Sequence, residues 1–167
     1  NGTVISILET LKEKLGDVAV RLSVTGSAGM GIAERCNIPF VQEVVASCEL
    51  ILKKFPSIRT LVDIGGEDAK MILFKENKSP DIRMNGNCAG GTGSFIDQMA
   101  TILGVEVSEL SDMALRATTI YPIASRCGVF SKTDVQNLLA RNVSKEDIAA
   151  SIFHAVSMQV ITSLARG

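Results

Sequence analysis

The chain has 167 residues, of which 46% are hydrophobic and 21% charged, and its formal net charge is −1. This composition is typical of a soluble globular domain and too apolar for a disordered chain. Without a basic excess, a nucleic-acid-binding surface is not expected, and neither is a membrane span. Four cysteines, none spaced as C-x-x-C, favour a reducing, cytoplasmic compartment over a secreted disulfide scaffold.

The first third of the chain predicts helix, strand, loop and helix. Apolar residues at helical spacing predict a helix over residues 4–15. The apolar run at residues 18–24 predicts a strand, and residues 25–31 are rich in glycine and predict a loop. A second helix is expected over residues 42–54.

The middle of the chain predicts a small antiparallel sheet followed by helices. Strands are expected at residues 59–64, 70–74 and 81–84, and the short connection between the first two suits a hairpin. Helical spacing returns at residues 92–103 and 108–117.

The last third carries two helix-start signals. Ser131 followed by Asp134 resembles a capping box, and Ser144 followed by Asp147 repeats the pattern at the start of a long helix. The mixture of strands and helices indicates an α/β domain. Because the chain opens and ends within regular patterns, we expect it to be a fragment of a longer protein.

The first candidate site is residues 63–70, which read Asp-Ile-Gly-Gly-Glu-Asp-Ala-Lys. A glycine pair after a strand lets backbone N–H groups approach a phosphate. The Asp63 carboxylate could hold Mg²⁺, and Glu67 or Asp68 could orient an attacking water. The same residues would equally suit a hairpin turn with solvated charges.

The second candidate site is residues 85–95, a glycine-rich loop that contains Cys88 and enters a helix. The N–H groups at a helix N-terminus and the helix dipole favour an anion, either a phosphate or a thiolate-ligated cluster. A cysteine here should ionise more readily than a buried one. The alternative is that Cys88 is a small core residue and the glycines shape the turn.

The third candidate site surrounds Cys127, which lies between Arg126 and Gly128. Arg126 is expected to lower the pKa of the thiol, and Gly128 leaves room for close approach. Cys88 and Cys127 are two ligands, whereas a four-iron cluster usually has four thiolates, so two subunits could complete the set at a symmetric interface.

The remaining candidates are interpreted as structural. Cys48 lies on the apolar stripe of its helix and Cys36 at the end of an element, and packing is favoured for both. His154 has no sequence partner that would indicate a catalytic triad.

Three motifs in this order, at residues 63–70, 87–95 and 125–130, resemble the activator family of 2-hydroxyacyl-CoA dehydratases and benzoyl-CoA reductases. The resemblance implies an α/β, ribonuclease-H-like ATPase fold of the actin, sugar kinase and chaperone superfamily. Residues 1–58 would end the first ATPase half, and residues 59–167 would form the core of the second.

The resemblance also implies ATP, Mg²⁺ and one 4Fe–4S cluster that a homodimer shares through Cys88 and Cys127. It implies a dehydratase or reductase as partner and an electron donor such as ferredoxin or flavodoxin. Asp63 and Glu67 would be catalytic. The cofactor-binding residues would be Asp63, Gly65, Gly66, Lys70, Gly91, Thr92 and Gly93.

The chain departs from the family pattern in three places. An N-terminal phosphate motif and a late adenosine-binding glycine pair are missing from the sequence, and Glu67 stands where the small activators have Gln. Two other functions remain open: an ATP-dependent small-molecule kinase, such as an amino-sugar kinase, and a non-catalytic dimerisation or regulatory module.

Overall fold

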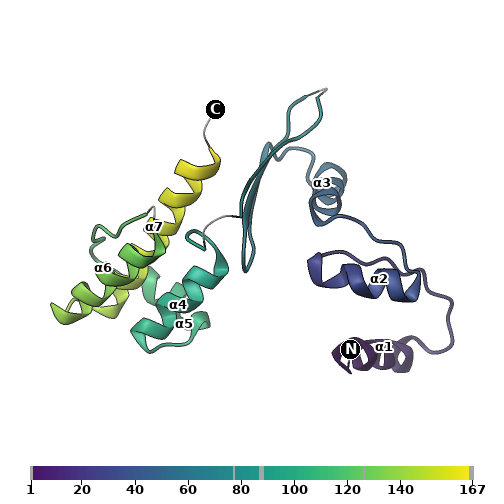
Figure 1. Cartoon of the computed structure of the whole chain (residues 1–167), viewed down its shortest axis with the longest axis horizontal. Coiled ribbons are helices and arrows are strands. Elements are labelled where there is room, and N and C mark those ends of the chain that lie inside the picture. The colour runs from purple at the N-terminus through teal and green to yellow at the C-terminus, as the bar shows by residue number, and fades with distance from the viewer. Residues whose placement is uncertain (1, 77, 87–88, 126, 166–167) are drawn as a thin grey trace. The chain divides into compact units, whose positions relative to one another are not determined.

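The computed structural model describes residues 2–76, 78–86, 89–125 and 127–165 of the chain. The chain divides into two compact units, Asn1–Pro56 and Ser57–Gly167 (Figure 1). The assignment of these units to two ATPase halves stays a prediction.

Helices dominate the first unit. Helix α1 spans Gly2–Leu15 and α3 spans Glu43–Lys54, so both expected helices are confirmed. The expected loop instead contains a 3₁₀ turn at Ser27–Gly29 and a short helix, α2, at Met30–Cys36. Helix α2 ends at Asn37, whose φ of 50° is left-handed, and Asn is one of the few residue types that adopts this conformation readily.

The prediction of a strand over residues 18–24 is wrong. Within the described residues the segment makes one parallel bridge, between Val24 and Phe40, and no strand. Val18 and Val20 are exposed. Apolar residues favour extended backbone, but a strand forms only where a neighbouring strand accepts and donates the ladder hydrogen bonds.

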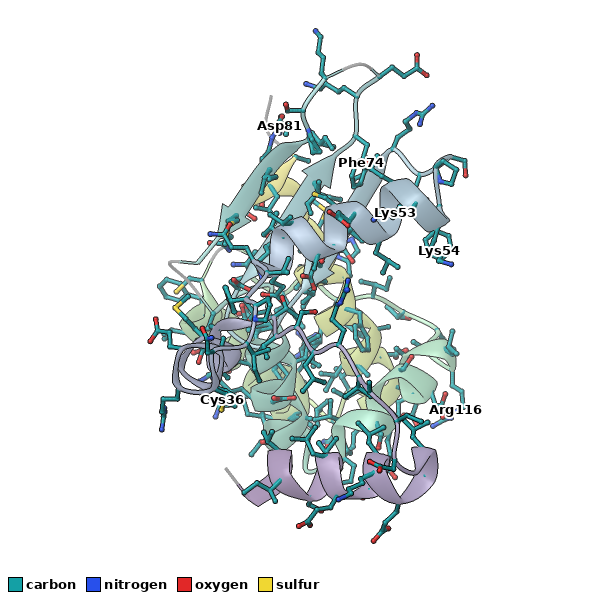
Figure 2. The ribbon with its side chains drawn as sticks, turned by 90° about the vertical axis from the view of Figure 1, so that its right-hand side faces the viewer. Cys36, Lys53, Lys54, Phe74, Asp81 and Arg116 are labelled. Carbon is teal, nitrogen blue, oxygen red and sulfur yellow. The ribbon has the colours of Figure 1, made fainter. Side chains whose placement is uncertain are left out.

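The second unit begins with a three-stranded antiparallel sheet, as predicted. The strands are β1 at Thr60–Ile64, β2 at Ala69–Leu73 and β3 at Asp81–Asn85, in the order β1-β2-β3. Figure 2 labels Phe74 and Asp81, which lie at the same end of the sheet, where β2 leads into β3.

Helix α7, which spans Lys145–Leu164, packs on the sheet and joins it to the other helices. Val160 and Leu164 near its C-terminal end are buried against Ala69 and Met71 of β2. The α7 window is long and apolar enough to cross a membrane by composition, but 56% of it is buried inside the protein. In this unit α7 acts as the central helix of a packed core.

The remaining helices surround α7. They are α4 at Gly93–Leu103, α5 at Val107–Leu115 and α6 at Gly128–Ala140 (Figure 1). Their shared core includes Phe95, Met99, Leu110, Val135, Ile148 and Ile152, each at most 2% exposed.

The start of α6 differs from the sequence prediction. Ser131 was expected to cap the helix, but α6 begins three residues earlier, at Gly128, with Cys127 in the N-cap position. The second expected cap is confirmed, because the Ser144 hydroxyl accepts a hydrogen bond from the Asp147 backbone N–H at 3.1 Å.

Candidate functional site

The loop after β1 is a tight turn held by a backbone hydrogen bond and by ion pairs to Lys70. The N–H of Gly65 donates to the carbonyl of Asp68 at 2.9 Å. The Nζ of Lys70, on β2, lies 3.0 Å from the Asp68 carboxylate and 4.0 Å from that of Asp63. Lys70 is 5% exposed, so its charge holds the two carboxylates beside the turn from the inside of the protein.

Asp63 and Glu67 are both reachable from solvent. The side chain of Asp63 keeps 35% of its exposure, and Glu67 is exposed. A partly solvated carboxylate near the end of a strand remains available to a cation such as Mg²⁺.

The first two predicted motifs meet through two backbone hydrogen bonds. The N–H of Gly93 donates to the Gly65 carbonyl at 2.8 Å, and that of Ser94 donates to the Gly66 carbonyl at 3.0 Å. A Cβ at Gly93 would lie 3.2 Å from the Gly65 oxygen, so glycine permits this close approach. These bonds join residues that are far apart in the sequence, and no sequence motif predicts them.

The same two bonds change the expected role of the α4 N-terminus. Its first two N–H groups, which would otherwise be open to an anion, are used by the carbonyls of the Gly65–Gly66 turn. The α4 dipole therefore begins directly behind this turn. A negative group bound at the turn would lie near the positive end of the helix.

The turn before α4 is a buried, self-bonded structure. The backbone N–H and the hydroxyl of Thr92 both donate to the Ala89 carbonyl, and Thr92 is fully buried. Gly91 has φ +80°, a conformation that favours glycine. Thr92 and Gly91 thus shape the loop, while Asn87 and Cys88 lie outside the described residues.

Cys127 lies at the N-terminus of α6, and its surroundings favour the thiolate. Hydrogen bonds from the backbone N–H groups of Phe130 and Val129 lower the pKa of the Cys127 thiol, while slight burial opposes them. The N-terminus of α6 therefore favours the thiolate. The effect expected of Arg126 stays a prediction. Arg126 itself lies outside the described residues.

A pair of polar side chains from α6 holds the segment that leads into Cys127. The buried Ser131 hydroxyl donates to the carbonyls of Ala124 and Cys127. The Asp134 carboxylate accepts from the Ala124 N–H at 2.8 Å. The sequence pattern of Ser131 and Asp134 predicts a helix cap, but in the structure the two side chains hold this segment instead.

Phe95 connects the start of α4 to the start of α6. Its ring is 2% exposed and lies against Gly128, where an added Cβ would be 3.7 Å from the ring. Because Gly93 and Ser94 precede Phe95 directly, one turn of α4 contacts both the Gly65–Gly66 turn and the Cys127 end of α6.

The other two cysteines have different surroundings. Cys48 is partly buried, and burial raises the pKa of its thiol, as expected for a packing residue. Cys36 is exposed, so the packing role expected for it is wrong within the described structure. His154 is exposed on α7.

Within the described ranges, no group of three or more His, Cys, Asp or Glu residues lies close enough together to hold a metal ion. Cys127 is therefore not part of a complete ligand set formed by the described residues of one chain.

Three comparisons with known proteins agree. The chain is 34% identical over 161 residues to the (R)-2-hydroxyglutaryl-CoA dehydratase activating ATPase of Acidaminococcus fermentans, covering 95% of this chain and 60% of that protein. It is 39% identical over 112 residues to the 2-hydroxyisocaproyl-CoA dehydratase activator of Clostridioides difficile, covering 66% of this chain and 42% of that one.

A solved structure of the Clostridium difficile activator of 2-hydroxyisocaproyl-CoA dehydratase, with ADPNP bound, matches with a TM-score of 0.80 and 33% identity. The match covers 94% of this chain and 59% of that one. The chain thus spans roughly three fifths or less of the relatives it matches, and it has part of the actin-like ATPase fold, as the sequence predicted.

The sequence pattern of one ATPase family matches residues 1–167, the whole chain. Together with the relatives, this establishes that the chain belongs to the BadF/BadG/BcrA/BcrD ATPase family.

Proposed function

We propose that the protein containing this chain couples ATP hydrolysis to electron transfer from a 4Fe–4S cluster that two copies share. The electron would activate a 2-hydroxyacyl-CoA dehydratase or a related CoA-ester reductase. The observation that carries the proposal is the pair of hydrogen bonds that tie the Gly65–Gly66 turn to the first residues of α4. They join a turn suited to phosphate to the helix that follows the Cys88 loop.

The nucleotide part of the proposal rests on the turn after β1. Asp63 would hold Mg²⁺ and Glu67 would orient the attacking water, and both are accessible to solvent. Gly65 and Gly66 would contact the phosphate. The buried Lys70 would hold the turn in place through its ion pair with Asp68. Among relatives, the Clostridium difficile activator was solved with ADPNP bound.

The residues on the α4 side would act mainly through the shape of the loop. The sequence predicts a cofactor-binding role for Gly91, Thr92 and Gly93, and their hydrogen bonds and backbone angles set the path of the chain from residue 89 into α4. Their contribution to the nucleotide site would therefore be indirect.

The cluster part of the proposal rests on Cys127. A thiolate is the form that ligates iron, and the α6 N-terminus lowers the pKa of this thiol. Cys127 and Cys88 would each supply one ligand, and a second copy would supply the other two. When bound, the cluster supplies a one-electron donor, while this chain's residues hold its ligands and exclude water.

The first turn of α4 would transmit a movement at the nucleotide site to the cysteine loops. Nucleotide can change the conformation of the protein only if it binds one conformation more tightly than another. A shift of the Gly65–Gly66 turn would move Gly93 and Ser94, and Phe95 would carry that movement to the start of α6. We place the protein in the cytoplasm, supplied with electrons by a ferredoxin or flavodoxin, because a thiolate-ligated cluster needs a reducing compartment.

The test is the iron and acid-labile sulfide content of the full-length protein prepared without oxygen. About four of each per dimer is the expected result. No iron after reconstitution would reject the cluster and would favour a kinase or a regulatory module of the same fold.

Cysteine variants sharpen this test. Cys88→Ser and Cys127→Ser should each lose iron while unfolding at the same urea concentration as cluster-free wild type. Cys48→Ser is the control: it should keep its iron and lose stability, by roughly 1 kcal/mol. Full iron in either of the first two variants would overturn the ligand assignment.

A further inference from the structure

The ammonium of Lys70 contacts two carboxylates beside the turn after β1, but not equally. Its Nζ is 3.0 Å from the Oδ1 of Asp68 and 4.0 Å from the Oδ2 of Asp63. The shorter distance is that of a charge-assisted hydrogen bond, whereas the longer one is an ion pair without such a bond. Asp68 is therefore the stronger of these two partners.

The strand register keeps Asp63 within reach of the same lysine. Asp63 on β1 and Lys70 on β2 are directly opposite each other, so their side chains share one face of the sheet. Lys70 is 5% exposed, and a buried ammonium is stable only when it is paired. If Asp68 held the ammonium less tightly, Asp63 could therefore take its place.

Glycine at position 65 lets the Asp68 carboxylate reach the lysine. A Cβ at Gly65 would lie 2.8 Å from the Oδ1 of Asp68, which is the atom that accepts from Lys70. The Gly65 N–H also donates to the Asp68 carbonyl at 2.9 Å. The turn itself thus places Asp68 to hold the ammonium.

A metal ion at Asp63 would compete with this ammonium. Mg²⁺ on a nucleotide is held by one or two protein carboxylates together with phosphate oxygens. It therefore does not require the larger ligand group that is absent from the described residues. An ammonium paired closely with Asp63 would have to be displaced before the metal could bind, and its charge would repel the metal.

We propose that Asp68 is a positioning residue, which holds the Lys70 ammonium and so leaves the Asp63 carboxylate free for the Mg²⁺ of a bound nucleotide. The inference rests on the proposed function, in which Asp63 holds this metal ion. It gives Asp68 a role other than orienting water, and that role then falls to the exposed Glu67.

The main experiment measures by calorimetry how tightly the full-length protein binds a non-hydrolysable ATP analogue, once with Mg²⁺ and once with EDTA. Asp68→Asn keeps the size of the side chain but removes its charge, so Lys70 should turn to Asp63. With Mg²⁺ we expect this variant to bind about tenfold more weakly than wild type, equivalent to about 1.4 kcal/mol, and with EDTA equally tightly. A merely structural role for Asp68 would weaken binding in both solutions.

Glu67→Gln is the matched control for charge. It removes the same charge from the neighbouring, exposed residue, and the analogue is not hydrolysed, so the water-orienting role proposed for Glu67 does not enter. Its Mg²⁺-dependent loss of affinity should be smaller than that of Asp68→Asn. An equal loss would show that the charge of the turn, rather than the pairing of Lys70, controls metal binding.

A variant at Lys70 separates the two explanations a second time. Lys70→Met has no ammonium to release, so adding Asp68→Asn should cost no further Mg²⁺-dependent affinity. If the loss of negative charge were the cause, the same cost would remain. Lys70→Gln, which is also neutral, replaces the methionine variant if that one folds poorly.

The outcomes distinguish this inference from the proposed function. A wild type that gains affinity from Mg²⁺, and loses this gain in Asp63→Asn but not in Asp68→Asn, rejects the role of Asp68 and leaves the proposed function standing. A wild type that does not bind the analogue rejects the nucleotide part of the proposed function and this inference with it. A Mg²⁺-specific loss in Asp68→Asn that disappears without Lys70 supports both.

Discussion

At Cys127 two backbone N–H groups make the thiol easier to ionise. The N–H groups of Phe130 and Val129 face the sulfur because the cysteine occupies the N-cap of α6. The sequence identifies the cysteine but not these two donors, because they depend on where α6 begins. The effect expected of Arg126 stays a prediction, since that residue lies outside the described residues.

The cysteines should therefore differ in their reaction with iodoacetamide. In cluster-free protein, Cys127 should be alkylated faster than Cys48 at neutral pH, because the pKa of Cys127 is lowered and that of Cys48 is raised by burial. Peptide mass spectrometry at a series of pH values measures both rates. Equal rates after correction for exposure, or a faster Cys48, would contradict this account.

Asp147 links the start of α7 to the segment after α5. Its carboxylate accepts from the backbone N–H groups of Thr118 at 2.7 Å and Thr119 at 3.0 Å. Both bonds lower the pKa of Asp147, and the bond from Thr119 has the larger effect. The charged carboxylate is thus preferred in the folded state.

Asp147 should make stability depend on pH in the acid range. Because the pKa of Asp147 is lower in the folded than in the unfolded protein, its stabilisation is complete above the ordinary aspartate pKa of about 3.9 and is lost as pH falls through the folded value. Asp147→Asn should be less stable at pH 7, and the difference should shrink below pH 4. Urea unfolding at each pH tests this, and a difference independent of pH would refute it.

At the level of elements, local signals predicted most helices and strands correctly. Apolar spacing located α4, and Gly104 with φ +63° ends it as expected. The failures involve distant partners: residues 18–24 lack a pairing strand among the described residues. Ser131 turns its hydroxyl toward Ala124 instead of capping a helix.

The candidate site shows the same limit. The sequence identified Asp63, the glycines and Cys127 as unusual, because each motif is contiguous. It could not show that Gly93 donates to Gly65, because that bond depends on how α4 packs against the sheet.

The bond between α4 and the Gly65–Gly66 turn predicts a difference between two variants at position 93. Gly93→Ala and Gly93→Pro both add a Cβ facing the Gly65 carbonyl, but proline also removes the N–H that this carbonyl accepts. Proline is acceptable at the first position of a helix, and Thr92 before it is already extended.

We expect Gly93→Pro to bind ATP more weakly than Gly93→Ala. One lost hydrogen bond of about 1 kcal/mol would raise the dissociation constant roughly fivefold beyond that of the alanine variant. Calorimetric titration of both full-length variants with a non-hydrolysable ATP analogue measures the difference. Identical affinities would show that the bond does not maintain the turn.

On the scale of the whole molecule, the two units differ in how many of their described residues are buried. In Asn1–Pro56 the buried described residues are Gly29, Ala33 and Ile51. In Ser57–Gly167 the helices share a continuous apolar core, and the sheet adds a second cluster against α7. Local unfolding is easiest where few apolar contacts must be broken.

Limited proteolysis of the 167-residue chain should therefore cut the first unit first. Residues 18–23, which are exposed and lie in no helix or strand, are the expected site, and a fragment beginning near residue 57 should persist. Mass spectrometry of the products over time tests this order. Early cleavage between α4 and α7 would contradict it.

The hydrogen bonds between the Gly65–Gly66 turn and α4 also bear on protein engineering. A designer who transplanted residues 63–70 into another ATPase would move two carbonyl acceptors without the helix amides that pair with them. Moving the Cys88 loop with α4 would create the opposite mismatch. The smallest portable unit is thus the sheet hairpin together with α4, so recombination between family members should be tolerated at boundaries outside residues 60–103 and disfavoured within them.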